Sequence, residues 1–186
     1  MAITNRPHAV MLAFPAQGHI KPMMHFSKIL SARGFYITFV NTEYIKEKMF
    51  KSGSSSHSMA DFRFETIPDG LPPHHGRMNQ LAELCESITN NCPPHFEELI
   101  DRLREMADVP PLTCIVYNGI MSWAQKTAER VGVPGVSFRT PSACGFNIYF
   151  SGPLLIEKGY FPLKAAFSEI QIRVSMATTN RLSILR

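Results

Sequence analysis

The stretch HAVMLAFPAQGHIKPMMHFSKILSARGFYITFVN, residues 8–41, combines the patterns that decide the fold. It opens with HAVMLAF, a short apolar run without helical spacing, which is typical of a buried strand. KPMMHFSKILSARG then shows helical spacing, with Pro22 in the expected first turn and Gly34 just past the expected end. A second β-rich run, FYITFVN, follows. This strand, helix and strand predict two parallel strands joined by a right-handed crossover.

The same alternation continues along the chain. Further strands are predicted in FRFETIP, LTCIVYN and VPGVSF. Helical patterns occupy EYIKEKMFKS, NQLAELCESITNNC, HFEELIDRLREMA, IMSWAQKTAERVG and SACGFNIYFSGPLLIEKG, the last interrupted near Gly152 and Pro153. The sequence therefore predicts an α/β fold with a single, Rossmann-like, doubly wound parallel sheet of five strands. Such sheets bind ligands beyond the carboxyl ends of their strands, which singles out the loops PAQGHI, NGIM and RTPSACG.

Composition excludes several classes of protein. The chain has 186 residues, a hydrophobic fraction of 45% and a net charge of +4, so it can bury a sizeable core. No run of Lys and Arg interleaves with aromatic residues, and we expect no nucleic-acid partner. No apolar stretch approaches the roughly 20 residues of a membrane span, and the N-terminus lacks the apolar region of a secretory signal. We expect a cytoplasmic protein without an integral membrane segment.

His19 lies in the first of the three loops, between a predicted strand and a predicted helix. That position directs an imidazole toward the ligand crevice and makes it a candidate catalyst, although a histidine in a loop can also be a polar turn or cap residue. Neither G-x-G-x-x-G nor G-x-x-x-x-G-K-[ST] occurs in the chain. A nicotinamide or nucleotide enzyme, which starts from the same α/β pattern, is therefore disfavoured.

The motif PAQGHIKPM, residues 15–23, resembles the N-terminal signature of plant family 1 UDP-glycosyltransferases. The resemblance continues through FRFETIPDGLP, LCESITNNC, DVPPLTCIVYNGIMSWAQKTAERVGVP and TPSACGFNIYFSGPLLIEKGYFPLK, and it covers residues 7–164. These segments are similar to the subgroup that glucosylates small terpenoid, iridoid and cyanohydrin acceptors.

The resemblance implies a fold, a reaction and a role for His19. In that family two Rossmann-like halves form the GT-B arrangement, the N-terminal half binding the acceptor and the C-terminal half the UDP-sugar. Glucose is transferred from UDP-glucose to a small-molecule hydroxyl with inversion, and the histidine that matches His19 is the general base. The expected partner is a small apolar hydroxylated acceptor. UDP-sugar is a co-substrate, and neither a cofactor nor a metal is expected.

Two residues depart from the family pattern. The family's histidine is normally backed by an aspartate in a loop that reads S-D-G, whereas this chain has Asn118 in that position. A neutral amide cannot compensate the charge of an imidazolium, so catalysis would suffer; alternatively, an Asn before Gly is simply good turn chemistry. Arg139 replaces the usual aromatic residue, and a guanidinium there would be costly to bury unless paired.

Other polar residues have weaker support as site residues. We expect Gln17, Gly18, Thr140 and Ser142 near the crevice, with Ser142 also able to cap the helix that follows it. The pair His74 and His75 lies in a Pro- and Gly-rich loop without a third ligand nearby, which makes a poor metal site.

The length of the chain raises a question about its activity. Family members are more than twice as long and bind the donor through a C-terminal box rich in Trp, His and Gly, whereas the single tryptophan here, Trp123, lies in the N-terminal half. We expect residues 1–164 to form the acceptor-binding domain, residues 165–186 a divergent tail, and the donor-binding domain to be absent. Such a truncated protein would be inactive alone. It could instead be a non-catalytic protein that binds a small molecule or pairs with a full-length relative.

Overall fold

The structure is a computed structural model that describes residues 6–51 and 61–160. The chain divides into two compact units, residues 1–140 and residues 141–186, which are described separately. The expected boundary between residues 164 and 165, and the expected tail, lie outside the described residues.

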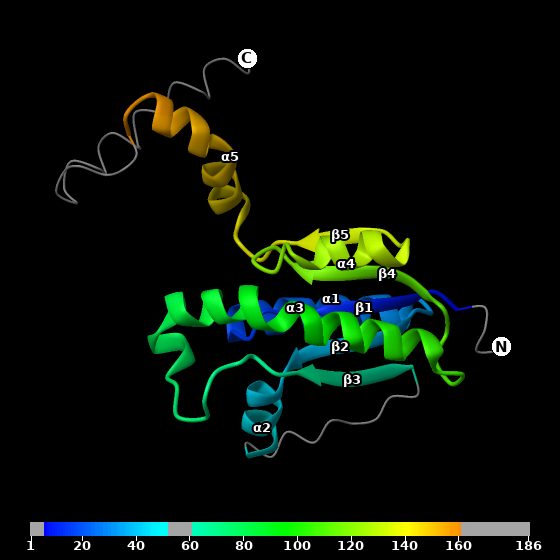
Figure 1. Cartoon of the computed structure of the whole chain (residues 1–186). Helices are drawn as coiled ribbons and strands as arrows, with labels where there is room; N and C mark the ends of the chain where they lie inside the picture. Colours follow the sequence, from blue (N-terminus) through cyan, green and yellow to red (C-terminus); the bar gives the residue numbers. More distant parts are fainter. Residues whose placement is uncertain (1–5, 52–60, 161–186) are drawn as a thin grey trace, which may run out of the picture. The chain divides into compact units, whose positions relative to one another are not determined.

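The first unit contains one parallel sheet in the strand order β3-β2-β1-β4-β5 (Figure 1). All five predicted strands are confirmed. They are β1 (His8–Leu12), β2 (Tyr36–Thr42), β3 (Phe62–Ile67), β4 (Leu112–Asn118) and β5 (Gly135–Phe138). Strand β1 pairs with β2 on one side and with β4 on the other, and all five of its residues are buried.

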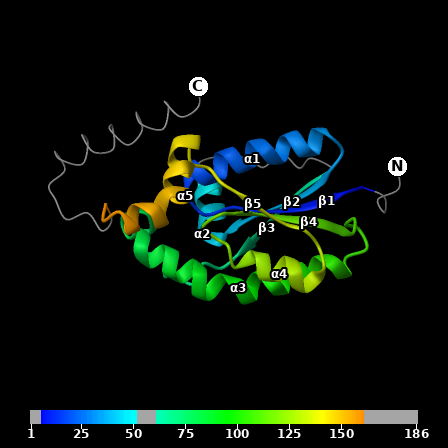
Figure 2. The same cartoon turned by 90° about the horizontal axis from the view of Figure 1, so that it is seen from above.

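Helices cover both faces of this sheet (Figure 2). One face is covered by α1 (Gln17–Ala32), and the other by α3 (Leu81–Glu105) and α4 (Ala124–Val131). A short helix, α2 (Glu43–Lys51), follows β2, and a 3-10 turn, η2 (Arg77–Asn79), precedes α3.

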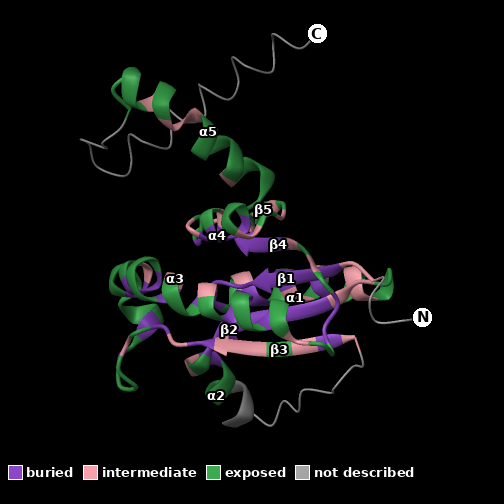
Figure 3. Ribbon diagram, turned by 45° about the vertical axis from the view of Figure 1, so that its right-hand side comes forward, coloured by how far each residue is buried: buried purple, intermediate pink, exposed green. Residues whose placement is uncertain are grey.

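Two apolar clusters hold these layers together. Alternate residues of β1 enter opposite clusters, Val10 and Leu12 on the side of α3, Ala9 and Met11 on the side of α1. The central strands are accordingly buried, whereas β3 at the edge of the sheet is largely half-buried (Figure 3). The continuous apolar runs in the sequence reflect this burial on both faces.

Helix α3 corrects one sequence prediction. The patterns before and after Pro93 and Pro94 predicted two helices, but the structure has a single helix of 25 residues. Prolines remove backbone hydrogen bonds inside a helix. The buried stripe continues on both sides of them, from Ile88 and Cys92 to Phe96 and Leu99, so packing on the sheet outweighs the lost bonds.

The second unit contributes α5 (Ala143–Glu157). Ser142 caps it as expected, because its Oγ accepts a hydrogen bond from the Gly145 backbone N–H at 3.2 Å. The expected interruption near Gly152 and Pro153 was wrong, since the helix runs through both residues. A single proline removes one backbone bond and leaves those of the adjacent turns in place. No helix in the described ranges is both long and apolar enough to cross a membrane.

His8 is a buried polar residue inside the first strand. Its Nδ1 lies 3.0 Å from the Pro110 carbonyl oxygen, and its Nε2 lies 2.8 Å from Thr38 Oγ1. A carbonyl oxygen can only accept, so Nδ1 carries the proton and Nε2 accepts from the Thr38 hydroxyl. Burial lowers the pKa of His8 from 6.5 to about 4. His8 is therefore a neutral structural residue.

We predict that His8 makes the protein sensitive to acid. The unfolded chain binds a proton near the ordinary pKa of 6.5, while the folded chain does so only near 4. Stability should therefore fall between these pH values, by up to about 3 kcal/mol. Denaturant unfolding of wild type and of His8→Gln at pH 7 and pH 4.5 measures the difference. The variant should lose less stability on acidification than wild type, whereas His25→Gln, at an exposed position, should behave like wild type. Equal losses for wild type and His8→Gln would contradict the assignment.

Candidate functional site

His19 is placed by the start of α1. The sequence predicted a helix that begins near Pro22, with His19 before it; the structure begins α1 at Gln17, so His19 is the third helical residue. The backbone N–H groups of His19 and Ile20 both donate to the Ala16 carbonyl at 2.9 Å, which closes the first turn. Pro22 then falls in the second turn, where it cannot donate the backbone hydrogen bond to the Gly18 carbonyl.

Two side chains from distant parts of the sequence contact the His19 imidazole, one at the end of β4 and one in the segment after β5. Asn118 Nδ2 lies 2.9 Å from His19 Nδ1, and Thr140 Oγ1 lies 3.1 Å from the same nitrogen. The Phe14 ring packs edge-on against the imidazole, with 5.2 Å between the ring centroids. Polar contacts at Nδ1 and an aromatic contact with Phe14 together fix the position of the imidazole ring.

The sheet explains why these residues meet. Leu12 near the end of β1 pairs with Tyr117 of β4, and Asn118 at the end of β4 pairs with Phe138 at the end of β5. The segments that follow β1, β4 and β5 therefore leave the sheet at the carboxyl ends of the strands, which is where parallel sheets bind ligands. His19, Asn118 and Thr140 are brought together from positions more than 20 residues apart in the sequence.

The surroundings of His19 favour its neutral form. Burial lowers the pKa of His19 below its ordinary value of 6.5. Asn118 is itself buried, with 1% of its surface exposed, and it brings no charge that would stabilise an imidazolium. A neutral imidazole has one nitrogen that donates and one that accepts, so either general-base chemistry or hydrogen bonding is open to it.

Three more of the predicted residues, Gln17, Gly18 and Arg139, lie in the segments that follow β1 and β5. Gln17 and Gly18 are exposed in the first turn of α1. Arg139 is exposed, so the expected cost of burying its guanidinium does not arise. Its side chain lies over Gly119, where an added Cβ atom would overlap Arg139 Nε. Gly119 therefore leaves the space that Arg139 occupies beside Asn118.

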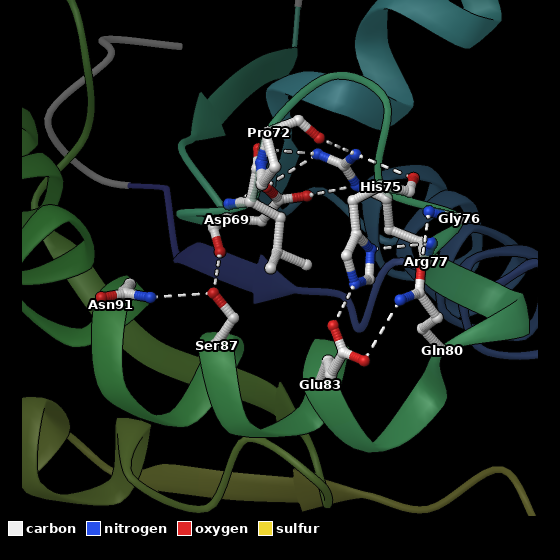
Figure 4. A network of polar contacts seen from close by, with 10 residues as sticks. Asp69, Pro72, His75, Gly76, Arg77, Gln80, Glu83, Ser87 and Asn91 are labelled. Carbon is white, nitrogen blue, oxygen red and sulfur yellow. Dashed lines mark hydrogen bonds and ion pairs between the residues drawn. The ribbon is translucent and has the colours of Figure 1, made fainter.

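A second polar cluster ties together the loop between β3 and α3 (Figure 4). Arg77 is 3% exposed, and its guanidinium binds both carboxylate oxygens of Asp69, at 3.1 and 3.2 Å. It also donates to the carbonyl oxygens of Leu71, Pro72 and His75. These bonds use all five guanidinium donors, as burial of the charge requires.

The same cluster includes His75. Its Nδ1 accepts a hydrogen bond from the Arg77 backbone N–H at 2.9 Å, so Nε2 carries the proton and donates to Glu83 Oε2 at 3.1 Å. Within the described ranges, no group of three or more His, Cys, Asp or Glu residues is arranged to hold a metal ion. The adjacent His74 is exposed.

The sequence did not single out Asp69 or Arg77. The only available signal was an acid and an arginine eight residues apart in a Pro- and Gly-rich loop, and such a spacing carries no specific geometry. Arg77 also lies over the Tyr44 ring, 3.9 Å from its centroid, and has a φ of 34°. This left-handed backbone is costly for a residue other than glycine, and the side-chain contacts stabilise it.

Comparison with known proteins identifies the family. A family model described as the glycosyltransferase N-terminal domain matches residues 8–131. The chain belongs to this family. The resemblance to the N-terminal half of plant family 1 UDP-glycosyltransferases, expected from the PAQGHIKPM motif, is thereby confirmed.

Curated plant relatives of this glycosyltransferase chain are much longer. UDP-glycosyltransferase 85A5 of Arabidopsis thaliana is 48% identical over 162 residues, which are 86% of this chain and 34% of the relative. (R)-mandelonitrile beta-glucosyltransferase of Prunus dulcis is 46% identical over 170 residues, which are 89% of this chain and 35% of the relative. The chain spans about a third of the length of these relatives.

Solved structures agree on the fold. Os79 T291V from O. sativa, in complex with UDP, is 25% identical, with a TM-score of 0.64 over 77% of this chain and 31% of that one. LpCGTa in complex with UDP, at 21% identity, has a TM-score of 0.62 over 82% of this chain and 35% of that one. The predicted fold class, an α/β domain that forms the N-terminal half of a GT-B fold, is confirmed.

We predict that the Arg77 cluster is a main source of stability in its loop. Arg77→Met leaves the Asp69 carboxylate, 5% exposed, without its cation, which should lower the free energy of unfolding by about 3–5 kcal/mol. Arg102→Met is the matched control, because it removes an exposed ion pair with Glu65 and should cost less than about 1 kcal/mol. Urea unfolding of both variants makes the comparison, and similar losses in the two would contradict the assignment.

Proposed function

We propose that this chain is the acceptor-binding half of an inverting UDP-glucosyltransferase-like protein. The contact of His19 with Asn118 and Thr140 at the carboxyl edge of the sheet carries the proposal, since it holds an imidazole where a ligand would bind. Relatives named for glucosyl transfer to (R)-mandelonitrile and 7-deoxyloganetin support a small acceptor with a hydroxyl group. Gln17 and Thr140 are the neighbouring polar residues that would orient such a molecule.

The proposed reaction requires a group that takes a proton from the acceptor. As the acceptor oxygen forms its bond to the anomeric carbon, the bond from that carbon to the UDP oxygen breaks, and UDP leaves with the electron pair. The hydroxyl proton would pass to His19 as general base. The lowered pKa of His19 suits this role, because the ring is then neutral near pH 7.

On its own, the 186-residue chain is proposed to bind an acceptor without transferring sugar. It matches the N-terminal third of longer relatives. Transfer requires a donor held in line with the attacking oxygen, and this positioning supplies several kcal/mol of the catalytic effect. Activity would then depend on a donor-binding half, whether it belongs to a full-length relative or to a longer protein.

The second candidate is a non-catalytic protein that binds a small molecule at the same edge of the sheet. Asn118 favours it, because a buried neutral amide replaces the carboxylate that normally accompanies the catalytic histidine. In a serine protease triad, the corresponding change from aspartate to asparagine lowers kcat by about 10⁴. Binding without chemistry would be the function of such a site.

We predict that acceptor binding and glucosyl transfer can be separated. Ligand-observed NMR with a panel of small terpenoid and aromatic alcohols should detect binding to the wild-type chain and weaker binding to His19→Ala. Mass spectrometry of the same mixtures with UDP-glucose should detect no glucoside. If the folded wild type bound none of the alcohols, the acceptor-binding function would be refuted. Glucoside formed by the chain alone would refute its dependence on a separate donor half.

A further inference from the structure

The oxygen and the nitrogen of the Asn118 side-chain amide have different hydrogen-bond partners. The Ile120 backbone N–H lies 3.2 Å from Asn118 Oδ1, and Asn118 Nδ2 lies 2.9 Å from His19 Nδ1. A backbone N–H can donate only to the oxygen of an amide. The turn after β4 therefore fixes the orientation of the Asn118 side chain and directs its NH₂ group at the imidazole.

This orientation decides where neutral His19 carries its proton. An amide NH₂ group can only donate, so His19 Nδ1 must be the acceptor of the 2.9 Å contact. A proton on Nδ1 would set two N–H groups against each other at hydrogen-bond distance. The Thr140 hydroxyl, 3.1 Å from the same nitrogen, can rotate to donate or accept and does not oppose either state.

We propose that Asn118 holds neutral His19 as the Nε2–H tautomer, so that the ring offers the ligand a hydrogen-bond donor instead of a proton acceptor. The inference rests on the proposed function for the location of the ligand. It favours the second, non-catalytic candidate, because a protonated Nε2 cannot take a proton from an acceptor hydroxyl. The favoured ligand is a small molecule that presents an acceptor oxygen, such as a ketone, or an alcohol bound through its lone pairs. Asn118 is thus a positioning residue that selects the ligand through His19.

An aspartate at position 118 would impose the opposite state. Its oxygens could accept from both the Ile120 N–H and a proton on His19 Nδ1, which would leave Nε2 with a lone pair for the acceptor hydroxyl. The two side chains have nearly the same shape. Asn118→Asp therefore changes the hydrogen-bonding character of this site with little change in its volume.

The chain contains an internal reference for each tautomer. His8 carries its proton on Nδ1, because that nitrogen faces the Pro110 carbonyl oxygen. His75 carries it on Nε2, because its Nδ1 faces the Arg77 backbone N–H. Nitrogen-15 NMR of the histidine-labelled chain near pH 7.5 distinguishes the two patterns through the couplings of each ring nitrogen to the ring protons.

We expect the His19 spectrum to resemble that of His75 in wild type and that of His8 in Asn118→Asp. Thr140→Val is the matched control, because it removes the other polar neighbour and should leave the tautomer unchanged. A wild-type His19 with the His8 pattern would overturn the proposal, as would a tautomer that switches in Thr140→Val. The wild-type spectrum is decisive even if Asn118→Asp fails to fold.

Binding provides a second readout. The oxygen of acetophenone can only accept a hydrogen bond, whereas the hydroxyl of 1-phenylethanol can also donate one. Comparing their affinities by calorimetric titration therefore shows whether the ring nitrogen that faces the ligand donates or accepts. Asn118→Asp should weaken the binding of acetophenone about five- to tenfold relative to that of 1-phenylethanol, which is the effect of about one hydrogen bond. An unchanged ratio would overturn the proposed selection. Failure of both compounds to bind would refute the acceptor site instead, and the tautomer measured by NMR would stand independently of it.

Discussion

The parallel pairing of β1 with β4 is the constraint on which the site depends. Leu12 and Tyr117 lie in register near the ends of these strands, so the segments that follow them leave the sheet side by side. This places His19, at the start of α1, against Asn118, the last residue of β4. The residues of β1 are fully buried, and its apolar side chains pack in two apolar clusters. The burial of this apolar surface stabilises the strand in its paired position.

Backbone groups set the chemistry of three histidines in this chain. A carbonyl oxygen faces His8, a backbone N–H faces His75, and at His19 the backbone acts through the Asn118 amide. Each ring receives a defined proton position because its neighbour can only donate or only accept. A single exchange of Asn for Asp therefore reverses what the site can do with a bound hydroxyl group, although it alters one side-chain atom.

The sheet could be predicted from the sequence because burial on both faces leaves continuous apolar runs, as in β1 and β4. The position of His19 beyond the end of β1 could be predicted from topology, and its proposed role rests on the resemblance. The continuity of α3 could not be predicted, because the packing of Phe96 and Leu99 outweighs the local effect of two prolines. The Arg77 cluster was also missed, because its bonds depend on a loop geometry that composition does not specify.

The direct interaction between His19 and Asn118 holds the candidate site together, and a double-mutant cycle measures its strength. The free energy of unfolding would be measured for wild type, His19→Ala, Asn118→Ala and the double variant. The cycle cancels the separate bond between Asn118 and the Ile120 backbone N–H. We expect a coupling energy of about 1 kcal/mol, the contribution of one hydrogen bond. Strictly additive effects would mean that the two side chains do not interact, and would contradict the account of the site.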